Sequence, residues 1–319
     1  MEATSRDDVP GNAVGVRRPA ADEAGAVAEL LNDHARELHG EALATAEEVA
    51  HWFRLPGVEL WVAQDSRGRL AAYADVREEA ERTRYWLYLC EHPRRRELGG
   101  AAALLGAAEE WSRRRAAPGA LLRGVVTRPD EPLSAAYDAA GYRLIRHSLE
   151  MRVELAGDLP EAEWPDGVAV RTFVPAEDER RVYEAEMDCF EDHWDFAREP
   201  YAAWRKRMVE HPTFDPLLWF LLEEGDELAG ISLCGIHTSG DPAFGWVTVL
   251  GVRRPWRRRG LGLGLLRHSL REFRRRGMTR AGLDVDAENL TGAVRLYEHA
   301  GMHVARRRDI VEKQLGAGS

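Results

Sequence analysis

Cysteine is scarce in this 319-residue chain, which has only Cys90, Cys189 and Cys234. Their number is odd, they lie far apart, and neither a CxxC pair nor a zinc-type spacing with histidine accompanies them. A disulfide framework and a metal centre are therefore not expected, and a reducing, cytoplasmic location suits the chain better.

Three other features are missing, and each absence excludes a class of partner or location. No apolar run approaches the roughly 20 residues that a membrane helix needs. The opening "MEATSRDDVPGNAVG" is too polar and acidic for a signal peptide. A basic excess is also missing, because 44 Lys+Arg face 54 Asp+Glu and the formal net charge is -10. Nucleic-acid binders usually carry a net positive field, so we expect no nucleic-acid partner and no membrane partner.

The chain does contain enough apolar residues for folded cores. Hydrophobic residues make up 45% of it, with ten tryptophans among them, and the length fits about two domains. Its two halves resemble each other, since four segments recur in the same order, 154 to 162 residues apart. The paired segments start at Val14 and Val168, at Leu60 and Leu218, at His92 and Arg254, and at Tyr137 and Tyr297. Four matches in register indicate a tandem duplication.

The duplication sets the expected domain boundaries. Residues 156–167 are rich in proline and acidic residues and lack the apolar pattern, so we expect a linker there. We expect an N-terminal domain over 1–155 and a C-terminal domain over 168–319. Each copy begins with a strand and a helical region, about 22–39 and 176–211, and continues with a hairpin, a strand, a glycine-rich loop and a helix. Strands alternating with helices predict an α/β fold.

Local patterns place several elements within this plan. Glycine among acidic residues predicts tight hairpin turns at 65–69 and 224–227. Leu266, Leu270 and Phe273 fall at i, i+4 and i+7, which predicts the apolar stripe of a helix. The alternation in "RAGLDVDA" predicts a strand, and a last helix is expected before the glycine of "HAGM".

The segment "VRRPWRRRGLGLGLL", residues 252–266, predicts an anion site. Its three glycines, Gly260, Gly262 and Gly264, let the backbone approach a ligand closely and adopt positive φ. The free N–H groups of the following helical turn and the helix dipole favour a negative charge. Three consecutive arginines add positive charge beside them. We interpret this loop as a pyrophosphate site for one small molecule, with a tight turn carrying solvated arginines as the alternative.

The spacing Arg257-x-x-Gly260-x-Gly262, with "VLGV" before it and "NLTGAVRLYEHAGM" after it, resembles the acetyl-CoA-binding core of the GNAT acetyltransferases. The residues of the second string that match the family are Asn289, Ala293, Tyr297 and Gly301. The resemblance covers the C-terminal half and, more weakly, the N-terminal half. In layout the chain also resembles mycothiol synthases, which carry two copies of this fold, and tandem actinobacterial acetyltransferases of uncharacterised function.

The resemblance implies two tandem GNAT-like domains, each a mixed, splayed central sheet flanked by helices, with acetyl-CoA as co-substrate. It implies that strand 246–252 parts from strand 280–287 to form a slot for pantetheine, and that a main-chain N–H in the first strand polarises the thioester carbonyl. The cofactor-binding residues implied in this way are Val249, Leu250, Gly251, Val252, Arg257, Arg258, Arg259, Gly260, Leu261, Gly262, Leu263, Asn289 and Tyr297.

The resemblance also implies that Tyr297 is the general acid that protonates the departing thiolate. A helical tyrosine taken alone is more often a core residue, and the surrounding family pattern is what favours the catalytic role. Asn289 either bonds the pantetheine or caps the helix, and the sequence leaves both open.

The general base is harder to place, because Trp246 stands where mycothiol synthases have a glutamate. This departure puts a mycothiol-type acceptor in doubt. In "DCFEDHWDFAREPYAAW", acids alternate with aromatics, which suits a cationic amine, and a solvated helix end is the alternative. The candidate catalytic residues there are Glu191 and Asp192, and the candidate substrate contacts are Glu191, Asp192, His193, Trp194 and Trp246. Further base candidates are His193, Asp195, Asp284 and Asp286, of which the last two are more typical of structural roles.

The first copy keeps Arg96-x-x-Gly99-x-Ala101, but Glu97 falls inside the loop and Pro129 replaces the asparagine of the second copy. A carboxylate in a phosphate loop is unfavourable, so we predict that the first copy is catalytically silent, with weak CoA binding as the alternative.

The sequence as a whole predicts an acyltransferase. The expected reaction is acetyl transfer from acetyl-CoA to a primary amine of a small, cationic molecule, by direct attack, in the C-terminal domain. A CoA-binding sensor without turnover and a mycothiol-synthase-like enzyme are the alternatives. A monomer and a homodimer both fit, because the duplication already supplies a pseudo-dimer.

Overall fold

The computed structural model describes residues 14–194, 196–288 and 292–316. The chain divides into two compact units by its contacts. The first unit comprises residues 1–125, 129–143 and 311–319, and the second comprises residues 126–128 and 144–310.

The first unit is a mixed sheet with helices packed on it. Its strands follow the order β1-β2-β3-β4-β5 and then the end of β12, with β4 and β5 parallel. These strands are β1 (Gly15–Arg17), β2 (Val58–Gln64), β3 (Leu70–Ala80), β4 (Arg84–Glu91), β5 (Leu121–Thr127) and β12 (His303–Gln314). Its helices are α1 (Ala24–His39), α2 (Ala46–Trp52), α3 (Gly100–Arg115) and α4 (Glu131–Ala139).

The second unit repeats this plan, with the strand order β6-β11-β10-β9-β8-β7 and with β10 and β11 parallel. Its strands are β6 (Arg143–Glu154), β7 (Val168–Thr172), β8 (Trp219–Glu224), β9 (Glu227–Ile236), β10 (Phe244–Val252) and β11 (Arg280–Asp286). Its helices are α5 (Glu179–Phe190), α6 (Tyr201–Met208), α7 (Leu261–Arg275) and α8 (Ala293–His299).

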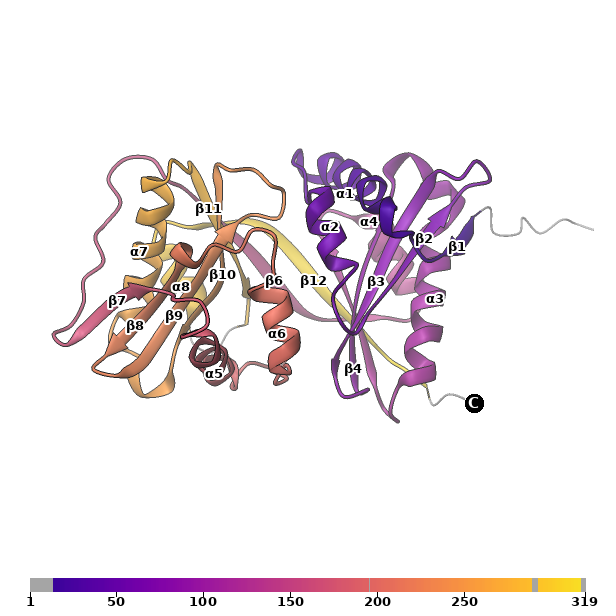
Figure 1. Ribbon diagram of the computed structural model, residues 1–319. Coiled ribbons are helices and arrows are strands. Elements are labelled where there is room, and N and C mark those ends of the chain that lie inside the picture. Colours follow the sequence, from indigo (N-terminus) through magenta and orange to yellow (C-terminus); the bar gives the residue numbers. More distant parts are fainter. Residues whose placement is uncertain (1–13, 195, 289–291, 317–319) are drawn as a thin grey trace, which may run out of the picture. The chain divides into compact units, whose positions relative to one another are not determined.

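Two cores hold the second unit together, one on each face of its sheet (Figure 1). The apolar stripe of α7 packs on one face with residues such as Val247 and Leu283. On the other face α5 and α6 bring Val182 and Trp204 against Leu221 and its neighbours. The sheet is therefore covered on both faces, as its apolar strands require.

Each unit takes a strand from the other half of the sequence. Residues 144–154 of β6 belong to the second unit, where β6 pairs with β11 from Arg280↔Glu154 to Asp286↔Ser148. Residues 311–314 of β12 belong to the first unit, where Leu315 N–H donates to the Ala120 carbonyl over 2.8 Å. The contacts thus interleave the two halves, whereas the repeat by itself suggests domains that follow one another.

The local patterns in the sequence predicted most of these elements. The hairpin turn at 65–69 is confirmed by the bond from Asp65 N–H to the Arg69 carbonyl, 3.0 Å long. The predicted stripe of α7 is buried along its length. The predicted helical region 176–211 contains two helices, α5 and α6. Pro200 is the N-cap residue of α6, and a helix start tolerates proline because no intrahelical N–H bond is needed there.

Candidate active site

The two parallel strands of the second unit separate midway along their length. Strand β10 pairs with β11 at Phe244↔Arg280, Gly245↔Ala281 and Trp246↔Gly282, and the pairing ends there. At the next residues the register of β10 against β9 shifts between Val247 and Val249. A bulge of this kind bends its strand and increases its twist. The bulge at Thr248 therefore turns the rest of β10 away from β11, as the family resemblance implies.

A cavity of about 90 Å³ lies where the strands part. Its walls come from β10, from β11, from α8 and from the end of α5. The lining residues are Phe190, His193, Val247, Thr248, Leu250, Leu283, Asp284, Val285, Asp286 and Tyr297. Three of the predicted site residues, Tyr297, His193 and Leu250, thus line one cavity, together with the further base candidates Asp284 and Asp286.

Tyr297 projects from α8 into this cavity and is only 8% exposed. Burial raises the pKa of its phenol to about 12, because the phenolate is poorly solvated there. The hydroxyl is therefore protonated at neutral pH and can donate a proton to a strongly basic neighbour. This is the property that a general acid for a leaving thiolate needs.

The glycine-rich loop leads directly into the first turn of α7, as predicted. Gly260 has φ +78° and is the residue before the helix, and Arg258 also has a positive φ of 66°. Nothing lies within 4 Å of the place that a Cβ on Gly260 would occupy. The first N–H groups of α7, a helix of 15 residues, are thus approachable from this side, which suits an anion.

The three loop arginines have different surroundings. Arg257 donates hydrogen bonds to the carbonyls of Val252 and Cys189, each with a donor–acceptor distance of 3.0 Å, and forms an ion pair with Asp192. Arg259 forms an ion pair with Glu224 over 2.7 Å. Arg258 is exposed, and among the described residues no hydrogen bond or ion pair holds its side chain. Arg257 and Arg259 therefore brace the loop, while Arg258 is left available to a ligand.

Glu191 and Asp192 lie beside this loop. Glu191 forms an ion pair with Arg254 over 3.2 Å, and Asp192 contacts both Arg254 and Arg257. Hydrogen bonds from these two arginines lower the pKa of Asp192, which makes its carboxylate a weaker base. Among the described residues that line the 90 Å³ cavity, neither acid appears.

Neither candidate tryptophan is among the described residues that line the cavity. Trp246 covers Gly282, where an added Cβ would be 2.6 Å from the indole, and its ring lies 4.9 Å from that of His237. Burial lowers the pKa of His237 to about 4, so this imidazole is neutral. The Trp194 ring lies 4.8 Å from the guanidinium of Arg146. Asn289 and Asp195 fall outside the described residues.

Sequence reasoning did not single out Thr248 or His237. His237 follows a strand of ordinary appearance, and only the packing of Phe244 over its ring marks it as a buried group. In "VTVLGV" the residue that favours a bulge or a close approach of the backbone is Gly251, so the sequence did not indicate the shift at Thr248. Val247 packs in the core on one face of the sheet and Val249 in the core on the other, and this sign of the bulge is visible only in the fold.

The first copy is built differently at the same positions. The Glu91 carboxylate accepts the N–H of Ala101, 2.5 Å away, in the first turn of α3. Tyr137 is fully buried and packs so closely on Gly124 that an added Cβ would be 2.5 Å from its ring. The pairing of β3 with β4 runs without a shift from Ala72↔Glu91 to Glu78↔Tyr85. An internal carboxylate thus takes one N–H of the helix start, and a core tyrosine stands where the second copy has Tyr297.

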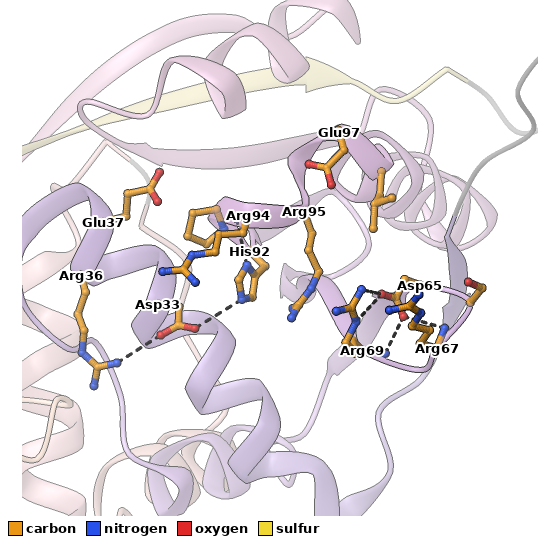
Figure 2. A pocket seen from close by; sticks show the side chains of 13 residues that line it. Asp33, Arg36, Glu37, Asp65, Arg67, Arg69, His92, Arg94, Arg95 and Glu97 are labelled. Atoms are coloured by element: carbon orange, nitrogen blue, oxygen red, sulfur yellow. Dashed lines mark hydrogen bonds and ion pairs between the residues drawn. The ribbon is translucent and has the colours of Figure 1, made fainter.

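A larger cavity, of about 1070 Å³, lies in the first unit beside this loop (Figure 2). Figure 2 shows its charges turned largely on one another, with Asp33 between Arg36 and His92, and Asp65 bonded to Arg69. Its lining comes from α1, from the turn after β2 and from the loop after β4. None of the described lining residues belongs to β4, β5 or α4. Despite its size it offers no counterpart of the slot that Tyr297 faces.

Other kinds of site find no support within the described residues. No group of three or more histidine, cysteine, aspartate or glutamate side chains there could hold a metal ion. No helix of the described part of the chain is both long and apolar enough to cross a bilayer.

Comparison with known proteins identifies the class that this fold and slot define. The model of the acetyltransferase (GNAT) family matches residues 179–302. The solved structure of a GCN5-related N-acetyltransferase from Sphaerobacter thermophilus is 33% identical, with a TM-score of 0.78 over 97% of this chain and 98% of that one. A tandem GNAT protein from the clavulanic acid biosynthesis pathway, 19% identical, shares the fold with a TM-score of 0.73 over 96% of this chain and 100% of that one.

The chain belongs to the GNAT acetyltransferase family and is an acyltransferase with two GNAT-like copies. Among curated proteins it is similar to the mycothiol acetyltransferase of Thermobispora bispora, at 36% identity over 53% of this chain and 58% of that protein. The match therefore spans little more than half the length of that relative.

Proposed function

We propose that the C-terminal copy transfers an acetyl group from acetyl-CoA to a primary amine of a small, cationic molecule. The observation that carries this proposal is the separation of β10 from β11 at the bulge, with Tyr297 lining the cavity that results. In the same proposal the N-terminal copy, residues 1–155 in the sequential division, performs no catalysis. Residues 168–319 carry the acetyl-CoA site, with residues 156–167 as linker.

The slot suits the pantetheine arm of acetyl-CoA. Among the described residues, the edge of β10 that faces β11 has no partner strand from Val247 onwards, so main-chain groups on that edge can bond to the ligand's amides. Successive residues of a strand point these groups to opposite edges, and the Arg253 N–H bonds to the Ala229 carbonyl of β9. The groups on the free edge are therefore those of Leu250 and Val252, of which the Val252 carbonyl also accepts from Arg257. Val249 and Gly251 point theirs at β9. An N–H of this edge, at Leu250 or Val252, would stabilise the negative charge that develops on the thioester oxygen.

The loop at the start of α7 suits the diphosphate. The N–H groups of Leu261, Gly262 and Leu263 and the positive end of the helix favour an anion there. Gly262 has little room for a side chain, because an added Cβ would lie 3.2 Å from Leu296. Arg258 would add a direct charge contact, while Arg257 and Arg259 keep the loop in shape.

The proposed reaction joins these parts. The amine nitrogen forms a bond to the acetyl carbonyl carbon, and the bond from that carbon to sulfur breaks. The Tyr297 hydroxyl gives its proton to the departing sulfur and is reprotonated from solvent. The attacking nitrogen loses two protons in all, one before the attack and one after it, so that a neutral amide and a free thiol result.

For the acceptor, only the chemical class is proposed. Phe190, Asp284 and Asp286 line the slot, and a lining of acids and aromatics favours a cationic amine. The relative named mycothiol acetyltransferase raises a mycothiol-type acceptor as an alternative, but Trp246 stands where the mycothiol synthases that this chain resembles have a glutamate. A CoA-binding sensor without turnover is the second alternative.

Release of free thiol from acetyl-CoA, measured with a panel of amines, tests the proposal. Amine-dependent release supports the enzyme, and mass spectrometry of the product identifies the acetylated nitrogen. Tight binding of CoA without thiol release from any amine would favour the sensor instead. Activity on the mycothiol precursor alone would favour the mycothiol-type enzyme.

A further inference from the structure

One carboxylate that lines the slot, that of Asp284, is exposed enough for a ligand to reach it. Asp284 lies on β11 at the cavity and is 45% exposed. Asp286, two residues on, faces the same side but is only 7% exposed, since Arg146 pairs with it over 2.8 Å. It also accepts the N–H of Glu288. Among the described cavity residues, Asp284 is thus the acid that an incoming molecule can reach.

Several charged groups surround Asp284. On β6, Glu150 is its partner in the strand register and is wholly buried. On β12, Arg308 contacts Asp284 and also pairs with Glu150 over 2.8 Å. Other groups that face this region are Arg152 of β6, Arg306 of β12, His237 after β9, His193 after α5, Tyr297 of α8 and Asp286 of β11 itself.

This arrangement leaves Asp284 with a partly compensated negative charge. Arg152 and Arg306 are directed at Glu150, over 2.5 Å and 3.6 Å, and Arg308 is shared between Glu150 and Asp284. Three arginines thus face two carboxylates; the buried Glu150 contacts all three of them, whereas Asp284 shares only Arg308. An ammonium group that enters the slot would meet Asp284 as its accessible counter-charge.

The other base candidates are less well placed. Glu191 and Asp192 are engaged by Arg254 and Arg257 beside the phosphate loop. Trp246 has no acid to offer. His193 lines the cavity and is the remaining competitor.

We propose that Asp284 binds the ammonium group of the acceptor and takes its proton, so that the neutral amine can attack the thioester. This inference rests on the proposed function and names the base that it lacks. One N–H bond of the ammonium breaks, its proton passes to a carboxylate oxygen, and the electron pair stays on nitrogen. The carboxylic acid then releases the proton to solvent in the cavity.

Desolvation by the surrounding protein raises the pKa of Asp284, although the Arg308 guanidinium beside it acts in the opposite direction. A raised pKa makes the carboxylate a better proton acceptor near neutral pH. The base must be ionised to act, so kcat/KM for the amine falls as the pH falls through this pKa.

The test compares Asp284→Asn with Asp226→Asn, the same chemical change in the exposed turn between β8 and β9. Two amines are used, one that is protonated at the assay pH and one of low pKa that is already neutral. We expect Asp284→Asn to lower kcat/KM for the protonated amine by about 10²-fold or more. We expect a much smaller loss of kcat/KM for the neutral amine. The pH profile of Asp284→Asn should lack the acidic limb, and its CoA affinity should be unchanged. Asp284→Glu should recover part of the activity.

The outcomes separate this inference from the proposed function. If the unaltered protein acetylates no amine, the proposed function and the role of Asp284 are both wrong. If it turns over and Asp284→Asn keeps full activity, or loses the same factor with both amines, only the role of Asp284 falls. A loss of the acidic limb in His193→Gln, with Asp284→Asn unaffected, would assign the base to His193.

Discussion

The two copies share a chain plan, yet they differ at the three places that make a thioester site. In the second copy β10 carries a bulge where it parts from β11, a tyrosine faces the resulting cavity, and among the described residues no carboxylate accepts an N–H of the first turn of α7. In the first copy β4 also parts from β5, after Leu87↔Gly124, but its pairing with β3 has no shift there, Tyr137 is core and Glu91 binds the helix start. One shared fold can thus carry local differences in packing and charge that decide what its site can do.

The largest difference should appear at the two loop glycines, Gly260 and Gly99. Both have positive φ, +78° and +70°, and nothing lies within 4 Å of an added Cβ at either. Gly260→Glu should abolish CoA binding, because it places a carboxylate against the diphosphate and strains the turn. Gly99→Glu imposes the same strain in the silent copy and should leave CoA affinity unchanged. Calorimetric titration with CoA measures both, and binding lost through Gly99 alone would reverse the assignment of the copies.

The two tyrosines give the next largest contrast. Tyr297→Phe should lower turnover by about 10²-fold or more while CoA affinity stays nearly unchanged, since only the proton donor is removed. Tyr137→Phe should leave turnover as it is. Within the described residues the Tyr137 hydroxyl has no hydrogen-bond partner, so its loss should not destabilise the fold. Equal rates in Tyr297→Phe and the unaltered protein would remove Tyr297 from the mechanism.

A gain of binding should follow from emptying the anion site of the first copy. Burial raises the pKa of Glu91, which shows how poorly its charge is solvated there. Glu91→Ala frees the N–H of Ala101 and should let inorganic pyrophosphate bind weakly at α3, as a second event beside the C-terminal site. Glu91→Gln keeps an acceptor oxygen and is the matched control. Titration with pyrophosphate decides, and a single site in Glu91→Ala would mean that the carboxylate is not what closes this loop.

The smallest effect is expected from the packing of Gly124 against Tyr137 in the first copy. Gly124→Ala forces a methyl group against the Tyr137 ring and should destabilise the chain by about 1–3 kcal/mol. Gly106→Ala, in α3 with nothing within 4 Å, should instead be neutral or stabilise by up to about 1 kcal/mol. The midpoints of urea unfolding report both changes. A neutral Gly124→Ala would indicate that the ring can move and that the first slot can still open.

Sequence reasoning predicted the features that depend on local chemistry. The glycine loop, the stripe of α7 and the tyrosine of α8 follow from spacing along the chain, and each lies where that spacing indicates. Long-range partners could not be read in this way. The pairing of Asp192 with Arg254 and Arg257 joins residues more than 60 positions apart, and it turns a candidate base into part of the loop. The bulge at Thr248 likewise depends on the register of β9.

Charge patterns were also ambiguous without the fold. Seven arginines in 249–273 indicated an anion site, but Asp192, just after α5, and Glu224 of β8 already pair with two of the three arginines of the loop. Conversely, Asp284 was a base candidate for which the sequence favoured a structural role. Only the parting of that strand from its neighbour exposes it to a ligand.

The exchange of strands between the halves has a consequence for the persistence of the duplication. A gene shortened to residues 168–319 would lose Leu144–Glu154, and β11 would then have a bare hydrogen-bonding edge along its whole length. Deleting the first half would therefore remove a strand on which the second half depends, and the bare edge would favour aggregation.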